Sequence, residues 1–210
     1  RRNIYLLATA SSAICIVSVI VEIPFHIVPT IPENTYDKVY VVGDSVSAGI
    51  AFKGERTWTE TAAGNLNVRI TNLSQGGGTT RSAISQAKLI KDGRALVFLE
   101  IGGNDMLGRT PLAEYREDLD KLLSGVSAPG RTIVMMEIPW APFHAGYCRT
   151  QRELARKYAA LLIPRRIFAG VLSGRESTED GIHLSNIGHG KMAEVFCKIC
   201  ESALKEKSKP

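Results

Sequence analysis

Several features that mark specialised classes of protein are missing from this sequence. The 210 residues contain no internal repeat and no low-complexity stretch. No basic stripe interleaved with aromatic residues is present, and the net charge of +5 comes from Lys and Arg scattered among Asp and Glu. A nucleic-acid partner therefore has little support. Hydrophobic residues make up 44% and charged residues 22%, which is typical of a globular domain and not of a disordered chain or a disulfide scaffold.

Cysteine is scarce, and the four cysteines form no recognisable framework. Cys15 lies in an apolar N-terminal segment, which leaves an odd number in the domain: Cys148, Cys197 and Cys200. The last two are spaced to share one face of a helix, and we expect them to be small core residues. A single C-x-x-C without a second pair or a histidine cluster gives no reason to expect a metal or a cofactor. An exported domain would permit a disulfide from Cys148 to one of the other two.

The N-terminus carries the one long apolar stretch. Arg1 and Arg2 precede residues 4–21, which hold no charged side chain; as a helix at about 1.5 Å per residue they would span roughly 27 Å, close to a bilayer core. The basic flank predicts a signal anchor or an export signal, with the domain that follows it extracytoplasmic, either periplasmic or extracellular. The alternative is a buried core helix. No small-x-small cleavage site follows Val21 before Pro24, which favours an uncleaved, membrane-anchored form.

The chain divides into three parts. Residues 1–34 read as the anchor and an extended linker, because Pro24, Pro29 and Pro32 punctuate its last third. Residues 35–204 form the folded domain. Residues 205–210 are a charged tail.

Within the domain, short apolar runs alternate with helical patterns, which predicts an α/β fold. The predicted strands are residues 39–42, 68–73, 95–101, 132–138 and 159–163. The predicted helices are residues 57–66, 81–91, 112–123, 150–157 and 187–204. Such alternation requires crossover connections, so we expect a mainly parallel five-stranded sheet covered by helices on both faces, a three-layer α/β/α sandwich. Residues 164–174 fit either helix or loop.

Three polar or glycine-rich motifs follow the first three predicted strands. They are Gly-Asp-Ser at residues 43–45, three glycines at 76–78, and Gly-Gly-Asn-Asp at 102–105. In parallel sheets, sites collect outside the carboxyl ends of the strands. Ser45 is therefore a candidate nucleophile, and the Asn104 side chain is a candidate donor to an oxyanion.

A fourth motif lies before the last predicted helix. Asp180 and His183 stand three residues apart on one short loop. A serine hydroxyl is a weak nucleophile at neutral pH, so an imidazole must take its proton and a carboxylate must orient that imidazole. The sequence around Ser45 is G-D-S-V-S-A-G, which does not fit the G-x-S-x-G elbow of the α/β-hydrolases.

The four motifs, taken in order, resemble those of the SGNH hydrolases, also called GDSL lipases and esterases. The resemblance covers residues 37–203 and implies the flavodoxin-like fold of that family. It implies that Ser45 is the nucleophile, that His183 is the general base and then the acid, and that Asp180 orients His183. It also implies an oxyanion hole made by the backbone N–H groups of Ser45 and Gly77 and by the side chain of Asn104.

One residue departs from the family pattern, and four other titratable residues have a structural interpretation. Val46 stands where the GDSL name expects Leu. Asp44 and Asp105 are expected to hydrogen-bond to nearby backbone. His189 is expected to pack at the start of the last helix, and His144 to lie in a loop beside the substrate.

The resemblance implies a serine esterase or lipase that hydrolyses carboxylic esters or thioesters through an acyl-enzyme, without a cofactor. Its substrates would be small esters, lipids or acylated sugars, and its membrane contact would be through the N-terminal helix. Residues 106–111 and 140–144 are the predicted specificity loops, and their apolar content favours an apolar pocket. Two alternatives use the same fold: an O-acyltransferase or deacetylase acting on cell-envelope glycans, and a catalytically silent binding module.

Overall fold

The computed structural model describes residues 22–33, 36, 38–50, 56–139, 144–174 and 176–204. The predicted anchor at residues 4–21, the tail at 205–210 and most of the loop at 140–144 lie outside these ranges. Among the described residues, no helix combines the length and the apolar character needed to cross a bilayer. The membrane anchor therefore stays a prediction from the sequence.

The sheet has five parallel strands, as the sequence predicts. The strands are β1 (Lys38–Gly43), β2 (Ile70–Asn72), β3 (Ala95–Glu100), β4 (Thr132–Met136) and β5 (Leu161–Ile163). Their order in the sheet is β2-β1-β3-β4-β5, and every neighbouring pair is parallel. The two central strands are almost entirely buried, which explains why their sequences are continuous apolar runs rather than alternating patterns.

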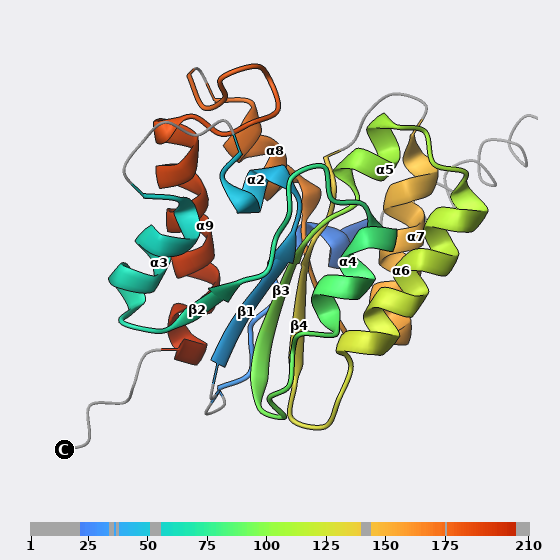
Figure 1. Ribbon diagram of the computed structural model, residues 1–210, viewed down its shortest axis with the longest axis horizontal. Coiled ribbons are helices and arrows are strands. Elements are labelled where there is room, and N and C mark those ends of the chain that lie inside the picture. The colour runs from blue at the N-terminus through green and yellow to red at the C-terminus, as the bar shows by residue number, and fades with distance from the viewer. Residues whose placement is uncertain are drawn as a thin grey trace, which may run out of the picture.

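Helices cover both faces of this sheet (Figure 1). One face carries α4 (Thr80–Ala87), α6 (Leu112–Val126) and α7 (Ala145–Lys157), and the other carries α3 (Trp58–Leu66), α8 (Arg165–Leu172) and α9 (Asn186–Leu204). Two short helices, α2 (Ser45–Ala48) and α5 (Gly103–Leu107), follow β1 and β3 directly. The expected three-layer α/β/α architecture is confirmed for the described domain.

Each layer has its own hydrophobic core. Along β1, Val39 and Val41 pack toward α3 and α9, whereas Tyr40 and Val42 pack toward α4 and α6, because successive side chains of a strand point to opposite faces. Three aromatic residues join α3, β3 and α9. The ring centroids of Trp58, Phe98 and Phe196 lie 5.1 to 5.8 Å apart, and such pairs each add about 0.5–1.5 kcal/mol beyond the area that they bury.

The described part of the segment before β1 contacts the domain, and it contains one helical turn where the sequence predicts an extended linker. A short 3-10 helix, η1, spans Ile23–His26. Glu22 pairs with the Arg152 guanidinium at 2.7 Å, and that guanidinium also stacks on the Phe25 ring at 4.2 Å. Ile31 is only 1% exposed and belongs to the α3–α9 core. The prolines suggested an extended chain, but ionic and apolar contacts attach this segment to α7 and to the core.

The suggested disulfide from Cys148 is also excluded. Cys148 belongs to the core on one face of the sheet and Cys200 to the core on the other, and all three described cysteines are free. Cys200 is buried and Cys197 is partly buried against the same core. Their interpretation as small core residues of a helix is confirmed.

The buried histidine of α9 predicts how stability depends on pH. His189 is 2% exposed, and its Nδ1 accepts the backbone N–H of Trp58 at 3.1 Å. Burial lowers the pKa of His189 from 6.5 to about 4. Between these values the unfolded chain binds a proton that the folded chain does not, so the free energy of unfolding should fall as the pH falls through this interval.

The variant His189→Asn should remove that contribution, because an amide oxygen can still accept from Trp58 but does not titrate. Urea unfolding of both proteins between pH 7 and pH 4 is the measurement. Parallel stability curves for the two proteins would contradict the assignment.

Candidate active site

Ser45 is the first residue of α2, in the tight turn by which β1 passes into that helix; we call residues 43–47 the serine turn. Asp44 is the N-cap of α2, and its Oδ1 accepts the Val46 N–H at 3.0 Å. Ser45 itself is 6% exposed. The turn therefore holds the candidate nucleophile at the carboxyl end of β1.

Two amide side chains from neighbouring elements brace the serine turn. Gln86 of α4 is fully buried; it donates to the Gly43 carbonyl and accepts from the Gly43 N–H, both at 3.1 Å. Asn72, at the end of β2, donates to the Ser47 carbonyl at 2.7 Å. Sequence reasoning missed both residues, although Gln86 is a polar residue on the buried face of α4.

The loop with three glycines at residues 76–78, which we call the glycine loop, lies directly against the serine turn. A Cβ on Gly78 would stand 3.1 Å from the Gly43 carbonyl oxygen and 3.3 Å from the Asp44 Cα. The Gly78 N–H donates to the Gln75 carbonyl at 3.1 Å. In contrast, Gly77 has a left-handed φ of 69°, and within the described ranges neither its N–H nor that of Ser45 has a partner. This arrangement favours Gly77 over Gly78 as the candidate that joins Ser45 in donating a backbone N–H to an oxyanion.

Asn104 connects the glycine loop to the serine turn. Its Nδ2 donates to the Gly78 carbonyl at 2.9 Å and lies 3.4 Å from Asp44 Oδ2. Three motifs that are far apart in the sequence thus meet at one edge of the sheet, as the parallel topology requires.

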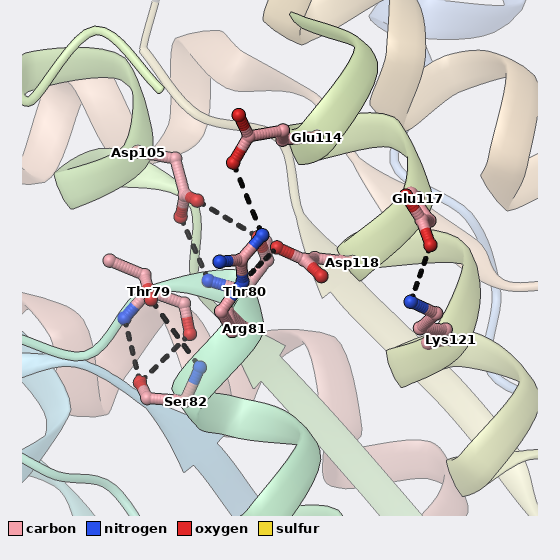
Figure 2. Close-up of polar contacts among 9 residues, drawn as sticks. All are labelled: Thr79, Thr80, Arg81, Ser82, Asp105, Glu114, Glu117, Asp118 and Lys121. Atoms are coloured by element: carbon pink, nitrogen blue, oxygen red, sulfur yellow. Dashed lines mark hydrogen bonds and ion pairs between the residues drawn. The ribbon is translucent and has the colours of Figure 1, made fainter. Parts of the chain in front are cut away.

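The neighbouring Asp105 fixes the position of α5 against the start of α4. Figure 2 shows its carboxylate accepting both the N–H of Thr80 at 2.8 Å and the Thr80 hydroxyl at 2.9 Å. One residue further along α4, Arg81 reaches α6 and pairs with Asp118 at 2.9 Å. The structural interpretation of Asp105 is confirmed, and these bonds keep Asn104 in register with the glycine loop.

The predicted acid and base are joined on their loop. Nδ1 of His183 lies 2.6 Å from Asp180 Oδ2, while Asp180 Oδ1 accepts the N–H groups of Ile182 at 3.0 Å and His183 at 2.8 Å. These hydrogen bonds hold the pKa of Asp180 well below its usual range, so the carboxylate stays ionised. With Nδ1 bonded to Asp180, Nε2 is the ring nitrogen left to act on a substrate or a hydroxyl.

Backbone contacts hold this loop in shape. Thr178 and Leu184 form an antiparallel bridge, and the Glu179 N–H donates to the His183 carbonyl at 2.8 Å. Lys191 of α9 donates to the buried Ser177 hydroxyl at 2.8 Å. The loop is therefore a small hairpin attached to α9.

In the described part of the chain, Ser45 and His183 are not hydrogen-bonded to each other. Burial raises the pKa of Asp44, and the charge of His183 opposes that rise, so the imidazole lies within electrostatic reach of the serine turn. Figure 1 shows the loop before α9 over the same end of the sheet as α2. Catalytic hydrogen bonds are often long before substrate binds.

Two buried carboxyl groups meet at the serine turn, one of which, that of Asp44, belongs to the turn itself. Asp44 is 4% exposed and Glu100, at the end of β3, is 2% exposed. Burial raises the pKa of Asp44 to about 6 and that of Glu100 well above its usual range. No group of three His, Cys, Asp or Glu side chains is placed to hold a metal ion within the described ranges.

Comparisons with known proteins define the class as hydrolases of the esterase and lipase type. A model of the GDSL-like lipase/acylhydrolase family matches residues 41–191, and the chain belongs to that family.

Individual relatives agree with this assignment. An arylesterase of Vibrio mimicus is 31% identical over 113 residues, which are 50% of this chain and 56% of the arylesterase, so the match spans little more than half of that relative. The esterase TesA of Pseudomonas aeruginosa is 26% identical over 157 residues, covering 68% of this chain and 77% of TesA. A crystal structure of TesA superposes with a TM-score of 0.71 at 23% identity, covering 80% of this chain and 100% of that one.

The close approach of the glycine loop predicts the effect of one methyl group. Gly78→Ala should destabilise the fold by about 1–3 kcal/mol, because the added Cβ meets backbone atoms of the serine turn that cannot move aside independently. Gly125→Ala in α6 is the matched control: no atom lies within 4 Å of its added Cβ, and it should stabilise by about 0.5–1 kcal/mol. Urea unfolding of both variants is the measurement, and equal stability would contradict the packing described.

Proposed function

We propose that this protein is a serine hydrolase that cleaves carboxylic esters or thioesters through an acyl-enzyme on Ser45. The observation that carries the proposal is the meeting of four motifs at one sheet edge. The loop before α9, on which Asp180 and His183 are bonded at 2.6 Å, lies over the end of the sheet that holds the serine turn, and Asn104 contacts both that turn and the glycine loop.

In the proposed first step, Nε2 of His183 takes the proton of Ser45 while the serine oxygen attacks the acyl carbon. Asp180 holds Nδ1 and stabilises the imidazolium that forms. His183 then gives its proton to the leaving alcohol or thiol as the bond to the acyl carbon breaks. Water then attacks the acyl carbon while His183 removes its proton, and His183 gives that proton to the serine oxygen as the bond to the acyl carbon breaks. The carboxylic acid leaves and the Ser45 hydroxyl is restored.

The oxyanion would be bound by the N–H groups of Ser45 and Gly77 and by Nδ2 of Asn104. The two backbone donors have no partner among the described residues, so they are available without breaking a bond. The 3.4 Å contact from Asn104 to Asp44 is long, so Nδ2 could donate instead to an oxyanion that comes within normal hydrogen-bond distance.

Exposed apolar side chains follow the elements at the site and support an acyl-chain substrate. Ile50 follows α2, Leu107 ends α5, and Ile182 lies between the candidate acid and base; they are 47%, 57% and 45% exposed. Leu107 belongs to the predicted specificity loop at 106–111. The names arylesterase and esterase TesA, carried by two relatives, support ester substrates in the same way.

Ser45→Ala should abolish hydrolysis of p-nitrophenyl esters of every acyl length, because no other hydroxyl takes the place of the nucleophile. The expected loss is at least about 10³-fold in kcat. The variant should unfold at the wild-type urea concentration. A fluorophosphonate probe should label the wild type at Ser45 and leave the variant unlabelled.

Near-normal turnover in Ser45→Ala would overturn the nucleophile assignment. A wild type that is inactive across the whole ester series and is not labelled would favour a silent binding module. Acyl transfer to an added polysaccharide, in preference to water, would favour the transferase alternative.

Asn104→Ala should lower kcat by about 10²–10³-fold with little change in KM, because the lost donor acts on charge that develops only in the transition state. Asn67→Ala is the control. Asn67 ends α3 in a left-handed conformation, so its replacement should cost some stability but leave kcat unchanged. Equal kcat values for the two variants would contradict the proposed role of Asn104.

A further inference from the structure

The serine turn rests on a buried carboxyl group that the proposed mechanism does not use. In the parallel register, Gly43 lies opposite Glu100, so the ends of β1 and β3 adjoin. Glu100 is 2% exposed, and no salt bridge joins it or Asp44 to a Lys or Arg among the described residues. A buried carboxyl without a cation is costly unless hydrogen bonds satisfy it or a proton neutralises it.

Among the described residues, the polar partners of the Glu100 carboxyl group belong to the serine turn. The Ser47 hydroxyl donates to Oε2 at 2.8 Å, and the backbone groups of Ser47 and Asp44 also act on this carboxyl group, opposing the rise of its pKa. These groups come from Asp44 and Ser47, which lie on either side of Ser45 in the sequence. Glu100 thus holds the turn from below at two points.

The side chains of Glu100 and Asp44 are hydrogen-bonded to each other. Two carboxylates in contact in a buried site repel strongly, so such a pair retains one proton. Burial raises the pKa of Asp44 to about 6 and that of Glu100 further, partly through the charge of Asp44. Near neutral pH the pair therefore carries one negative charge, on Asp44, and Glu100 carries the proton.

We propose that Glu100 is a positioning residue for the reaction assigned above, holding the serine turn in place as a protonated carboxyl group that donates to Asp44 and accepts from Ser47. This inference rests on the proposed function. The ionised Asp44 then caps the Val46 N–H and faces Nδ2 of Asn104.

The remaining charge is also placed to act on the base. The titratable groups acting on Asp44 from the elements around it are Glu100 of β3, Asp105 of α5 and His183 of the loop before α9. A negative Asp44 favours the imidazolium that His183 becomes in the transition state, whereas the Glu100 proton prevents a second negative charge from distorting the turn.

Steady-state kinetics of Glu100 variants test the proposal. Glu100→Met keeps the volume but removes the hydrogen bonds, and we expect kcat to fall about 10- to 100-fold at nearly constant KM, because a displaced nucleophile slows the chemistry more than it weakens binding. Glu100→Gln should recover most of that loss, since its amide donates to Asp44 and accepts from Ser47 as the protonated acid does.

Two further variants separate positioning from general stability. Ser47→Ala removes one bond from the other side, and should lower kcat several-fold even if Glu100→Met does not fold. Glu137→Gln is the control: Glu137 is an equally buried carboxyl just after β4, and it pairs with Arg152 at 2.6 Å. It should lower stability while kcat per folded molecule is unchanged.

The shared proton has a readout independent of turnover. The infrared carbonyl band of a protonated carboxyl group should be present in the wild type at pH 7 and reduced in Glu100→Gln. Wild-type kcat in Glu100→Met and Ser47→Ala, or a Glu100→Gln variant as slow as Glu100→Met, would overturn the proposal. An inactive wild type that keeps the infrared band would instead count against the proposed function alone.

Discussion

The parallel pairing of β1 with β3 is the interaction on which the rest of the site depends. It runs in register from Lys38 opposite Ala95 to Gly43 opposite Glu100, and both strands are buried between two helical layers. Because parallel strands end at the same edge, this pairing brings the serine turn and the start of α5 together without any contact between their motifs being needed first. The contacts of Asn104 with Asp44 and Gly78 follow from it.

The same pairing limits which residues can stand at the strand end. A Cβ on Gly43 would lie 2.8 Å from the Glu100 carbonyl oxygen, a separation that no side chain tolerates unless the strands move apart. The Gln86 side chain satisfies both the N–H and the carbonyl of Gly43. A glycine at this position therefore serves the close packing of the two strand ends.

Local patterns predicted the fold well where one element carries its own signal. All five strands and the order of the four motifs could be read from the sequence, because buried parallel strands are short apolar runs and their ends carry polar residues. Helix α8 could not be assigned, since Pro164 precedes it and its eight residues mix arginines with a glycine. The docking of residues 22–33 was missed because it depends on Arg152, more than a hundred positions away.

The sequence could not indicate the buried polar residues that hold the serine turn in place. Glu100 ends an apolar strand and Gln86 sits in an ordinary helical pattern, so neither carries a motif; their roles appear only when β1, β3 and α4 are packed together. A buried acid beside another acid is unfavourable for folding by itself. The group that donates to Glu100 belongs to the serine turn, so the cost of burying this acid is offset only when the turn has its native shape. Stability and the geometry of the candidate nucleophile are thereby coupled, and a chain that loosened the turn would also expose an unsatisfied carboxyl group.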